Sequence, residues 1–242
     1  IRVFNEPMFS AKVLERIEKL GEWQVKMTIS EHGDAPNIGS NDGAMLENLH
    51  ECEFRDFRPS SQQLFGLLNN KKVYPDGDWN EPLFWRSNQL VDQMNYHAIK
   101  YPESQVLDGQ FLIIRKNKLA CYLCIPNAKF RPGFDVFHLD IWYEGKNIFI
   151  DSGSYSYNAG DLTNNFKSVK AHNSVQFGTH EPMPKISRFL NAEWIMPDIV
   201  SKPYEDDGFT RWTCSYTDYM GNNHKRSIQV SDLFVKIIDE VD

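Results

Sequence analysis

The hydrophobic positions in the first part of the chain recur at helical spacing. One apolar face is formed by Phe9, Val13, Leu14, Ile17 and Leu20, which fall on one side of a helix with 3.6 residues per turn. Ser10 is a candidate N-cap, and Gly21 is expected to end this helix. Shorter apolar groups predict three more helices, over residues 45–49, 60–68 and 82–94, separated by loops rich in Gly, Pro, Asn and Asp.

From about residue 106 the pattern changes to alternation and tight turns. Segments 111–115 and 119–125 flank a Lys-Asn-Lys turn, and 136–143 and 147–151 flank Glu-Gly-Lys, so each pair predicts a hairpin. Further strands are predicted over 173–177, 186–196, 209–216, 225–230 and 233–238. Many short strands at this spacing are typical of an antiparallel β-sandwich.

The change of period divides the chain near Tyr101-Pro102. We therefore predict a helical part over 1–105 and an antiparallel β-sandwich over 106–242, an α+β multidomain organisation. The predicted helices are too few to close a core of their own. The chain also starts at Ile1 and stops soon after a predicted strand. We expect it to be a segment of a longer protein.

Composition excludes several classes of protein. The formal charge is −7, 41% of the residues are hydrophobic and 24% are charged, as in ordinary globular domains. An acidic chain without a basic block argues against nucleic-acid binding. No apolar run approaches the roughly 20 residues of a membrane span. The four cysteines are too few for a disulfide scaffold. Cys121 and Cys124 fall on opposite faces of a predicted strand, so we expect small buried residues and no chelating pair.

Two polar motifs accompany the first predicted strands of the sandwich. Alternation places His138 and Asp140 on one strand face, where they could form a hydrogen-bonded pair or simply a polar outer surface. The run Asp-Ser-Gly-Ser-Tyr-Ser-Tyr-Asn follows the next strand. Its Tyr155 and Tyr157 could hydrogen-bond to a sugar or move a proton. The alternative is an ordinary loop with packed aromatic rings.

Two histidines begin predicted strands and are candidate metal ligands. His172 lies in Lys-Ala-His-Asn-Ser-Val, and His224 follows 52 residues later in Asn-Asn-His-Lys-Arg. Together with one carboxylate they would supply the three protein ligands of a zinc site. A surface histidine, or one satisfied by hydrogen bonds, is the alternative reading of each.

Six motifs in order resemble those of the heparinase II/III-like family of polysaccharide lyases. More narrowly, they resemble members associated with bacterial cell-surface polysaccharide gene clusters. The matching stretches are PNIGSNDGA at 36–44, RDFRPS at 55–60, HLDIW at 138–142, IDSGSYSYN at 150–158, AHNSV at 171–175 and HKR at 224–226. Each motif is short, and it is their common order that makes the set specific.

This resemblance implies a fold and an activity. The family is built as an α/α toroid followed by an antiparallel β-sandwich, so 1–105 would be the last toroid helices and 106–242 much of the sandwich. Its members cleave uronate-containing acidic polysaccharides by β-elimination. A base removes the proton beside the uronate carboxylate, and an acid protonates the leaving oxygen. The resemblance also implies a zinc site and a location in the bacterial periplasm or cell envelope.

The resemblance also implies roles for single residues. His172 and His224 match zinc-binding histidines, while the third ligand, a carboxylate, has no clean match; Glu193 by spacing, or Glu181, is a candidate. Lys170 stands where family members often have a catalytic histidine, and a lysine could neutralise a uronate carboxylate. The toroid's catalytic Asn and Tyr would precede Ile1. Candidate catalytic or rim residues are Lys170, Tyr155, Tyr157 and His138, and candidate substrate-binding residues are Asn41, Asp42, Asn173 and Arg226.

Two other functions remain open at this point. The lysine at position 170 favours a non-catalytic polysaccharide-binding or assembly protein on the same scaffold. A glycoside hydrolase would need paired carboxylates across a cleft, for which Asp140 and Asp151 are candidates.

Overall fold

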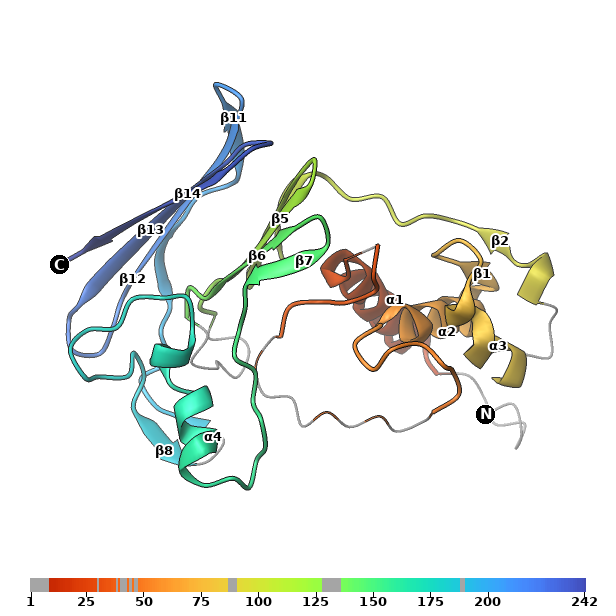
Figure 1. Cartoon of the computed structure of the whole chain (residues 1–242), viewed down its shortest axis with the longest axis horizontal. Coiled ribbons are helices and arrows are strands. Elements are labelled where there is room, and N and C mark those ends of the chain that lie inside the picture. The colour runs from red at the N-terminus through yellow and green to blue at the C-terminus, as the bar shows by residue number, and fades with distance from the viewer. Residues whose placement is uncertain are drawn as a thin grey trace. The chain divides into compact units, whose positions relative to one another are not determined.

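The computed structural model describes residues 9–29, 31–37, 39, 43, 45, 48–86, 91–127, 136–187 and 190–242. The chain forms two compact units (Figure 1). The first comprises Ile1–Ala35 and Met45–Tyr101, and the second comprises Pro36–Ala44 and Pro102–Asp242. The short segment 36–44 therefore belongs to the second unit, although it precedes most of the first in sequence.

The first unit is built from α-helices, which are α1 (Ala11–Met27), α2 (Arg58–Asn69) and α3 (Glu81–Arg86). Two 3-10 turns, at Asp78–Asn80 and Val91–Gln93, and a short parallel pair of β1 (Lys71–Lys72) and β2 (Asn95–Tyr96) complete it. Helix α2 contacts both α1 and α3. Among the described residues, no helix combines the length and the apolar character that a membrane span needs.

Gly21 does not end the first helix, contrary to the sequence prediction, because α1 continues to Met27. A Cβ atom at Gly21 would come within 2.5 Å of Leu64 Cδ2 and 2.9 Å of Phe65 Cε2 on α2. The glycine therefore allows two helices to approach closely. Its helix propensity is poor, but the packing of Phe65 and Val25 in the core of this unit outweighs that cost.

The other helix predictions are confirmed in part. Helix α2 begins two residues before the predicted start, with Phe57 as N-cap and Pro59 in its first turn. Segment 82–94 contains α3 and a 3-10 turn rather than one long helix, and 87–90 lie outside the described residues. Of the predicted helix at 45–49, the described residues 45, 48 and 49 are not helical.

The second unit contains two five-stranded antiparallel sheets. The first sheet has the order β3-β4-β5-β6-β7, with bounds Ser104–Leu107, Phe111–Lys116, Leu119–Cys124, Leu139–Tyr143 and Lys146–Phe149. The second sheet has the order β10-β12-β13-β14, with bounds Pro197–Val200, Phe209–Thr217, Asn223–Val230 and Val235–Val241. Its fifth strand, β11 (Tyr204–Asp206), also pairs with β12. Both predicted hairpins are confirmed.

One hydrophobic core joins the inner faces of the two sheets. Leu112 and Leu123 contribute from the first sheet and Trp212 and Ile228 from the second, and all four are fully buried. Along β13 burial alternates at every position, as expected for a strand with one face on the core. The predicted antiparallel sandwich is therefore present.

The segment between the sheets differs most from the sequence prediction. Residues 173–177 are not a strand, and the described residues of 186–196 take part only in the short pair β8 (Lys185–Ser187) and β9 (Leu190–Asn191). A short helix, α4 (Asp161–Phe166), and a 3-10 turn at Val169–Ala171 were not predicted. Side chains supply many of the hydrogen bonds in this segment, as when Ser168 caps the 3-10 turn, so no regular ladder is needed.

Candidate functional site

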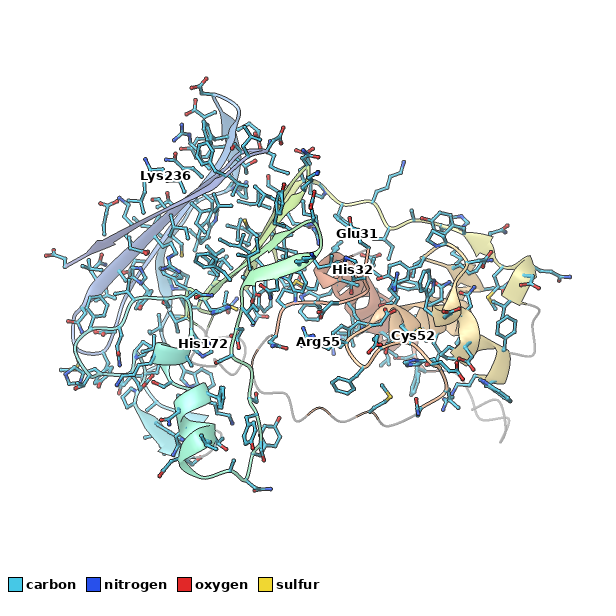
Figure 2. The ribbon with its side chains drawn as sticks, in the orientation of Figure 1. Glu31, His32, Cys52, Arg55, His172 and Lys236 are labelled. Carbon is cyan, nitrogen blue, oxygen red and sulfur yellow. The ribbon has the colours of Figure 1, made fainter. Side chains whose placement is uncertain are left out.

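Two histidines and two aspartates meet inside the second unit. His138 directly precedes β6, Asp140 lies within it, and Asp151 follows β7. His172, which is labelled in Figure 2, follows the 3-10 turn. His172 Nδ1 lies 3.0 Å from Asp151 Oδ2, and His138 Nε2 lies 3.0 Å from Asp140 Oδ2 and 3.7 Å from Asp151 Oδ2. No side chain of the four is more than 4% exposed. The predicted His138–Asp140 pair is confirmed, but it is buried.

The hydrogen bonds of His138 fix the position of its proton. The backbone N–H of Asn173 donates to His138 Nδ1 at 3.1 Å, so this nitrogen is an acceptor. A neutral imidazole then carries its hydrogen on Nε2, which faces the two carboxylates. The ring is therefore a donor to Asp140, with Asp151 close by at 3.7 Å, and the main chain holds it in one tautomer.

Asp151 remains a carboxylate in this cluster. Burial would raise the pKa of its side chain, but the hydrogen bond from His172, the nearby imidazoles and the N–H of Gly153 outweigh burial and lower the pKa. That N–H lies 2.7 Å from Asp151 Oδ1. The Asn37 side-chain amide also donates to the Asp151 backbone carbonyl, at 3.3 Å. This bond explains how segment 36–44 joins the second unit.

The donor set of the cluster fits a divalent metal. One ligand atom from each of His138, Asp151 and His172 lies within 4.8 Å of the others. A tetrahedral zinc at about 2.0–2.1 Å from its ligands would separate them by roughly 3.4 Å, between the 3.0 and 3.7 Å observed. For Nε2 of His138 to bind metal, its proton must move to Nδ1, and the Asn173 N–H contact must then be given up. His138 can therefore either bind a metal through Nε2 or carry its hydrogen on Nε2, but not both.

The ligand set differs from the one predicted from sequence, which shares only His172 with this group. His224 lies in β13, is fully buried, and has Nε2 2.8 Å from Asp239 Oδ1. Glu193 is exposed after β9 and has a positive φ of 48°. Glu181 accepts the backbone N–H of Val169 and the hydroxyl of Ser168, so it holds the turn before His172. Strand periodicity could not reveal that His172 lies beside His138 and Asp151, because His172 is in a loop.

Arg226 stabilises the two backbone segments that carry His138 and His172. Its Nη1 donates to the carbonyls of Phe137 and Asn173, the residues adjoining His138 and His172. Its Nε and Nη2 bind the two oxygens of Asp239 at 2.7 and 2.8 Å. The guanidinium was a predicted substrate contact, but it is only 5% exposed and all these bonds are internal.

The other predicted substrate-binding residues have different positions. The Asn173 amide donates to the Leu139 carbonyl at 3.2 Å, so this side chain is engaged in joining its loop to β6. Asn41 and Asp42 lie outside the described residues. His138, predicted at the rim, is 2% exposed. A substrate therefore cannot reach His138 in this arrangement.

The Asp239 contacts predict a dependence of stability on pH. Burial would raise the pKa of Asp239, but bonds from His224 and Arg226 outweigh it and hold the pKa well below the usual value of about 3.9. The carboxylate therefore contributes stability above about pH 4, and this is lost as pH falls toward the folded pKa. We expect the stability difference between the wild type and Asp239→Asn to narrow between pH 5 and 2.5. Urea unfolding across this range measures it, and a constant difference would contradict the assignment.

Aromatic and basic side chains lie on the segment between Asp151 and His172. Tyr155 and Lys170 are exposed, and Tyr157 and Lys167 are half-buried; these four are called the exposed rim. Tyr155 is 68% exposed, has a positive φ of 53°, and stacks on Phe166 at 5.8 Å between ring centroids. The Nζ of Lys167 lies 5.0 Å from the ring centroid of Tyr157. Lys170 is exposed in the 3-10 turn. A bulky residue with positive φ is strained, and such strain is concentrated at functional sites.

The geometry does not suit a glycoside hydrolase that uses Asp140 and Asp151. Both carboxylates contact the same nitrogen of His138 and are 1% and 4% exposed. Hydrolysis needs the two groups on opposite sides of a glycosidic bond. These two are engaged with one imidazole, and no cleft separates them.

Comparison with known proteins agrees with this architecture. Residues 129–242 match the family described as heparinase II/III-like, C-terminal. This part of the chain is similar to heparinase II/III-like C-terminal domains. The match contains His138, Asp151 and His172 as well as the exposed rim. The family resemblance noted in the sequence is thereby confirmed.

Solved structures extend the likeness in fold to nearly the whole chain. The heparinase III-BT4657 gene product aligns with a TM-score of 0.67 and 15% identity over 97% of this chain. The heparan sulfate lyase HepC from Pedobacter heparinus aligns with 0.63 and 16% over 99%. The chain spans 33% and 34% of those two structures. No curated protein matches its sequence.

Proposed function

We propose that the chain is part of a polysaccharide lyase that cleaves an acidic, uronate-containing polysaccharide by β-elimination. The observation that carries this proposal is the family match over 129–242, which encloses both the buried His–Asp–His cluster and the exposed rim. We also assign the helical unit to the end of an α/α toroid. The chain's likeness in fold to heparinase III over its first unit supports this assignment. The periplasmic or envelope location stays a prediction.

The exposed rim supplies the groups that elimination needs at the substrate. The Lys170 ammonium neutralises the uronate carboxylate, which makes the neighbouring C–H acidic enough to lose its proton. Tyr155 and Tyr157 carry hydroxyls suited to exchanging a proton with the sugar or binding it. His138 is buried, so we assign it a positioning role through Asp151. The Lys167 ammonium beside Tyr157 favours the anionic substrate and partly offsets the net charge of −7.

His138, Asp151 and His172 are the residues that would hold a metal, and we propose zinc from the two-imidazole, one-carboxylate donor set. Bound there, zinc supplies a fixed positive charge close to the rim segment. The three ligands come from the start of β6, the end of β7 and the loop after α4. By binding one metal ion, the three ligands would connect these segments and so hold the exposed rim in place.

Elimination by the complete protein that carries this chain tests the proposal. Heparan sulfate is the first probe, and products with a new double bond are detected by ultraviolet absorbance. We expect Lys170→Met to lower the rate roughly 100-fold, the size of loss seen when a group that stabilises transition-state charge is removed. Lys146→Met, an exposed lysine on β7, is the matched control and should leave the rate unchanged.

The products distinguish the rival functions. Saturated fragments with new reducing ends would indicate a hydrolase and would contradict the proposal. Binding of several uronate polysaccharides with no cleavage of any would favour a non-catalytic binding or assembly protein. The departure at Lys170, where the family often has histidine, is the observation that favours this second function.

A further inference from the structure

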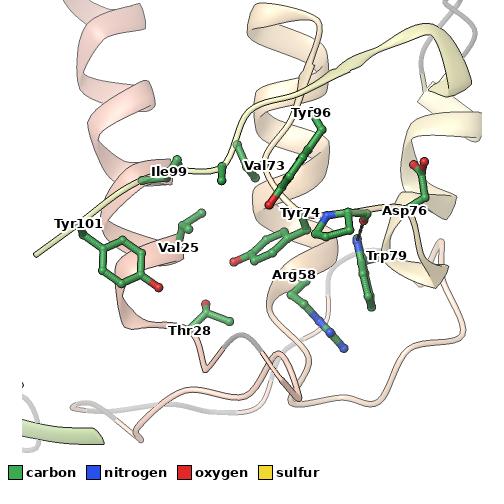
Figure 3. A pocket seen from close by; sticks show the side chains of 12 residues that line it. Val25, Thr28, Arg58, Val73, Tyr74, Asp76, Trp79, Tyr96, Ile99 and Tyr101 are labelled. Carbon is green, nitrogen blue, oxygen red and sulfur yellow. Dashed lines mark hydrogen bonds between the residues drawn. The ribbon is translucent and has the colours of Figure 1, made fainter. Parts of the chain in front are cut away.

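A pocket of about 390 Å³ lies within the helical unit (Figure 3). Its lining residues come from the end of α1, the start of α2, and the segments 73–79 and 96–101. All of them belong to one compact unit. The volume is within the range of small-molecule sites, so the pocket can hold one ligand of modest size.

Three hydroxyl groups gather at one end of this pocket. In Figure 3 the hydroxyls of Thr28, Tyr74 and Tyr101 are directed to the same region. Tyr74 is 7% exposed, and burial raises the pKa of its hydroxyl to about 12. This hydroxyl comes near those of Thr28 and Ser61, and yet it has no partner at hydrogen-bonding geometry among the described residues. A buried hydroxyl without a partner is costly, so a ligand that bonds to Tyr74 would relieve this cost.

The opposite side of the pocket is aromatic and held in place. The Trp79 indole donates to the Pro75 carbonyl at 2.8 Å, and the Arg58 guanidinium lies 3.8 Å from the centroid of its ring. A Cβ at Gly77 would come within 2.5 Å of this ring, so only glycine allows the close approach. Tyr96, which is 51% exposed, completes this side at the mouth. The aromatic wall is thus formed before any ligand arrives.

The charged groups in this lining, Arg58 and Asp76, are both paired. Arg58 binds Asp56 with Nε at 2.9 Å from Oδ1 and Nη2 at 2.7 Å from Oδ2. Asp76 accepts from Lys72 Nζ at 2.7 Å and from Asn80 Nδ2 at 2.8 Å. An ionic ligand would lose its hydration in the pocket and find no uncommitted counter-charge there. The pocket therefore favours an uncharged ligand.

We infer that this pocket binds an uncharged pyranose ring. Aromatic rings pack on the C–H faces of a sugar, and the cluster of hydroxyls exchanges hydrogen bonds with its hydroxyl groups. The inference rests on the proposed function in one respect, because a polysaccharide substrate would present such a ring. It deepens that function by adding a site for a neutral residue of the polysaccharide, distinct from the uronate.

Two matched probes test the inference with the full chain. Methyl β-D-glucopyranoside is neutral, and methyl β-D-glucopyranosiduronate differs from it at C6, where a carboxylate replaces the CH₂OH group. Titration is followed by the backbone amide signals of residues 73–79 and 96–101. We expect the neutral glycoside to bind in the millimolar range and the uronate at least tenfold more weakly. Uronate binding that equals or exceeds glucoside binding would overturn the inference, as would no binding of either.

Tyr74→Phe is the decisive variant. The hydroxyl has no well-formed bond within the described residues, so its removal should not lower the urea midpoint, while it should weaken glucoside binding about fivefold. Tyr122→Phe in β5, whose hydroxyl accepts from Arg115 at 3.0 Å, is the control and should not alter glucoside binding. Ala98→Trp, which places a bulky side chain in the lining, should abolish it. Unchanged binding by Tyr74→Phe and Ala98→Trp would overturn the inference.

The two proposals can fail separately. Elimination of heparan sulfate without glucoside binding at residues 73–79 would remove the pocket assignment and leave the lyase proposal standing. Glucoside binding that depends on Tyr74, in a protein that cleaves nothing, would leave the pocket as a sugar site and remove the lyase.

Discussion

Arg226→Met is expected to lower the free energy of unfolding of the sandwich by about 2–3 kcal/mol, the size of loss expected when hydrogen bonds from a buried charged group are removed; the Arg226 side chain is 5% exposed and that of its partner Asp239 is 27% exposed. The methionine keeps much of the side-chain volume but leaves Asp239 without its bidentate partner. It also removes the donor to the carbonyls of Phe137 and Asn173. Both losses act in the same direction, because Asp239 loses two charge-assisted hydrogen bonds and the two carbonyls lose their donor.

Hydrogen exchange of the β12–β14 amides measures this loss, because it reports opening of the sandwich separately from the helical unit. Lys225→Met is the matched control. Lys225 is the adjacent residue and pairs with Glu240 at 2.8 Å on the same two strands, but its side chain is 40% exposed. An exposed pair of this kind contributes at most about 1 kcal/mol. Equal effects of the two variants would show that the buried guanidinium does not hold the structure together.

The strands of the sandwich were predictable because their signals are local. Turn residues at 116–118 and 144–146 separate runs of apolar and alternating residues, and the observed hairpins β4–β5 and β6–β7 occupy these positions. The last three strands, β12 to β14, also fall close to the predicted segments. Each of these elements is defined by its own burial pattern, which a sequence displays directly.

The site was less predictable because its geometry is not local. Asp151 and His172 are 21 residues apart, and no periodicity connects a residue after a strand with one in a loop. His224 and Arg226 carried the signal of functional residues, being polar and close to a strand start. They are buried instead as partners of Asp239 on β14. Gly21 gave a similar false signal, since a helix stop and a close helix contact use the same residue.

The missed cluster and the misassigned residues His224 and Arg226 have one physical cause. A polar residue in a sandwich of this size can be satisfied by a neighbouring strand, by a loop or by a ligand, and the residue type is the same in each case. For His138 the deciding contact is the backbone N–H of Asn173, which carries no side-chain signature at all. For Arg226 it is two main-chain carbonyls.

Removal of one ligand from the His–Asp–His cluster is expected to weaken zinc binding by roughly 100-fold or more, a loss of about 2.7 kcal/mol. After treatment with a chelator, the chain is titrated with Zn²⁺ and the dissociation constant is measured by competition with a coloured chelator. His138→Gln, Asp151→Asn and His172→Ala should all show the loss. Each removes a donor atom that lies within 4.8 Å of the other two.

His224→Gln and Glu193→Gln are the variants that discriminate between the two ligand sets. His224 is held by Asp239, and Glu193 is exposed in a turn, so both variants should bind zinc as the wild type does. Loss of zinc in them, with retention in His138→Gln and Asp151→Asn, would restore the ligand set predicted from sequence. A wild-type chain that binds no zinc would remove the metal assignment altogether.

The imidazole of His138 gives the same experiment a second readout. Without metal its hydrogen is on Nε2, because Nδ1 accepts from the Asn173 N–H at 3.1 Å. A metal at Nε2 requires the hydrogen on Nδ1 and removes that acceptor. Zinc should therefore invert the ¹⁵N shifts of the two ring nitrogens and move the Asn173 amide signal. An unchanged Asn173 signal on saturation with zinc would show that His138 stays a hydrogen-bond donor to Asp140 and that the metal is held without it.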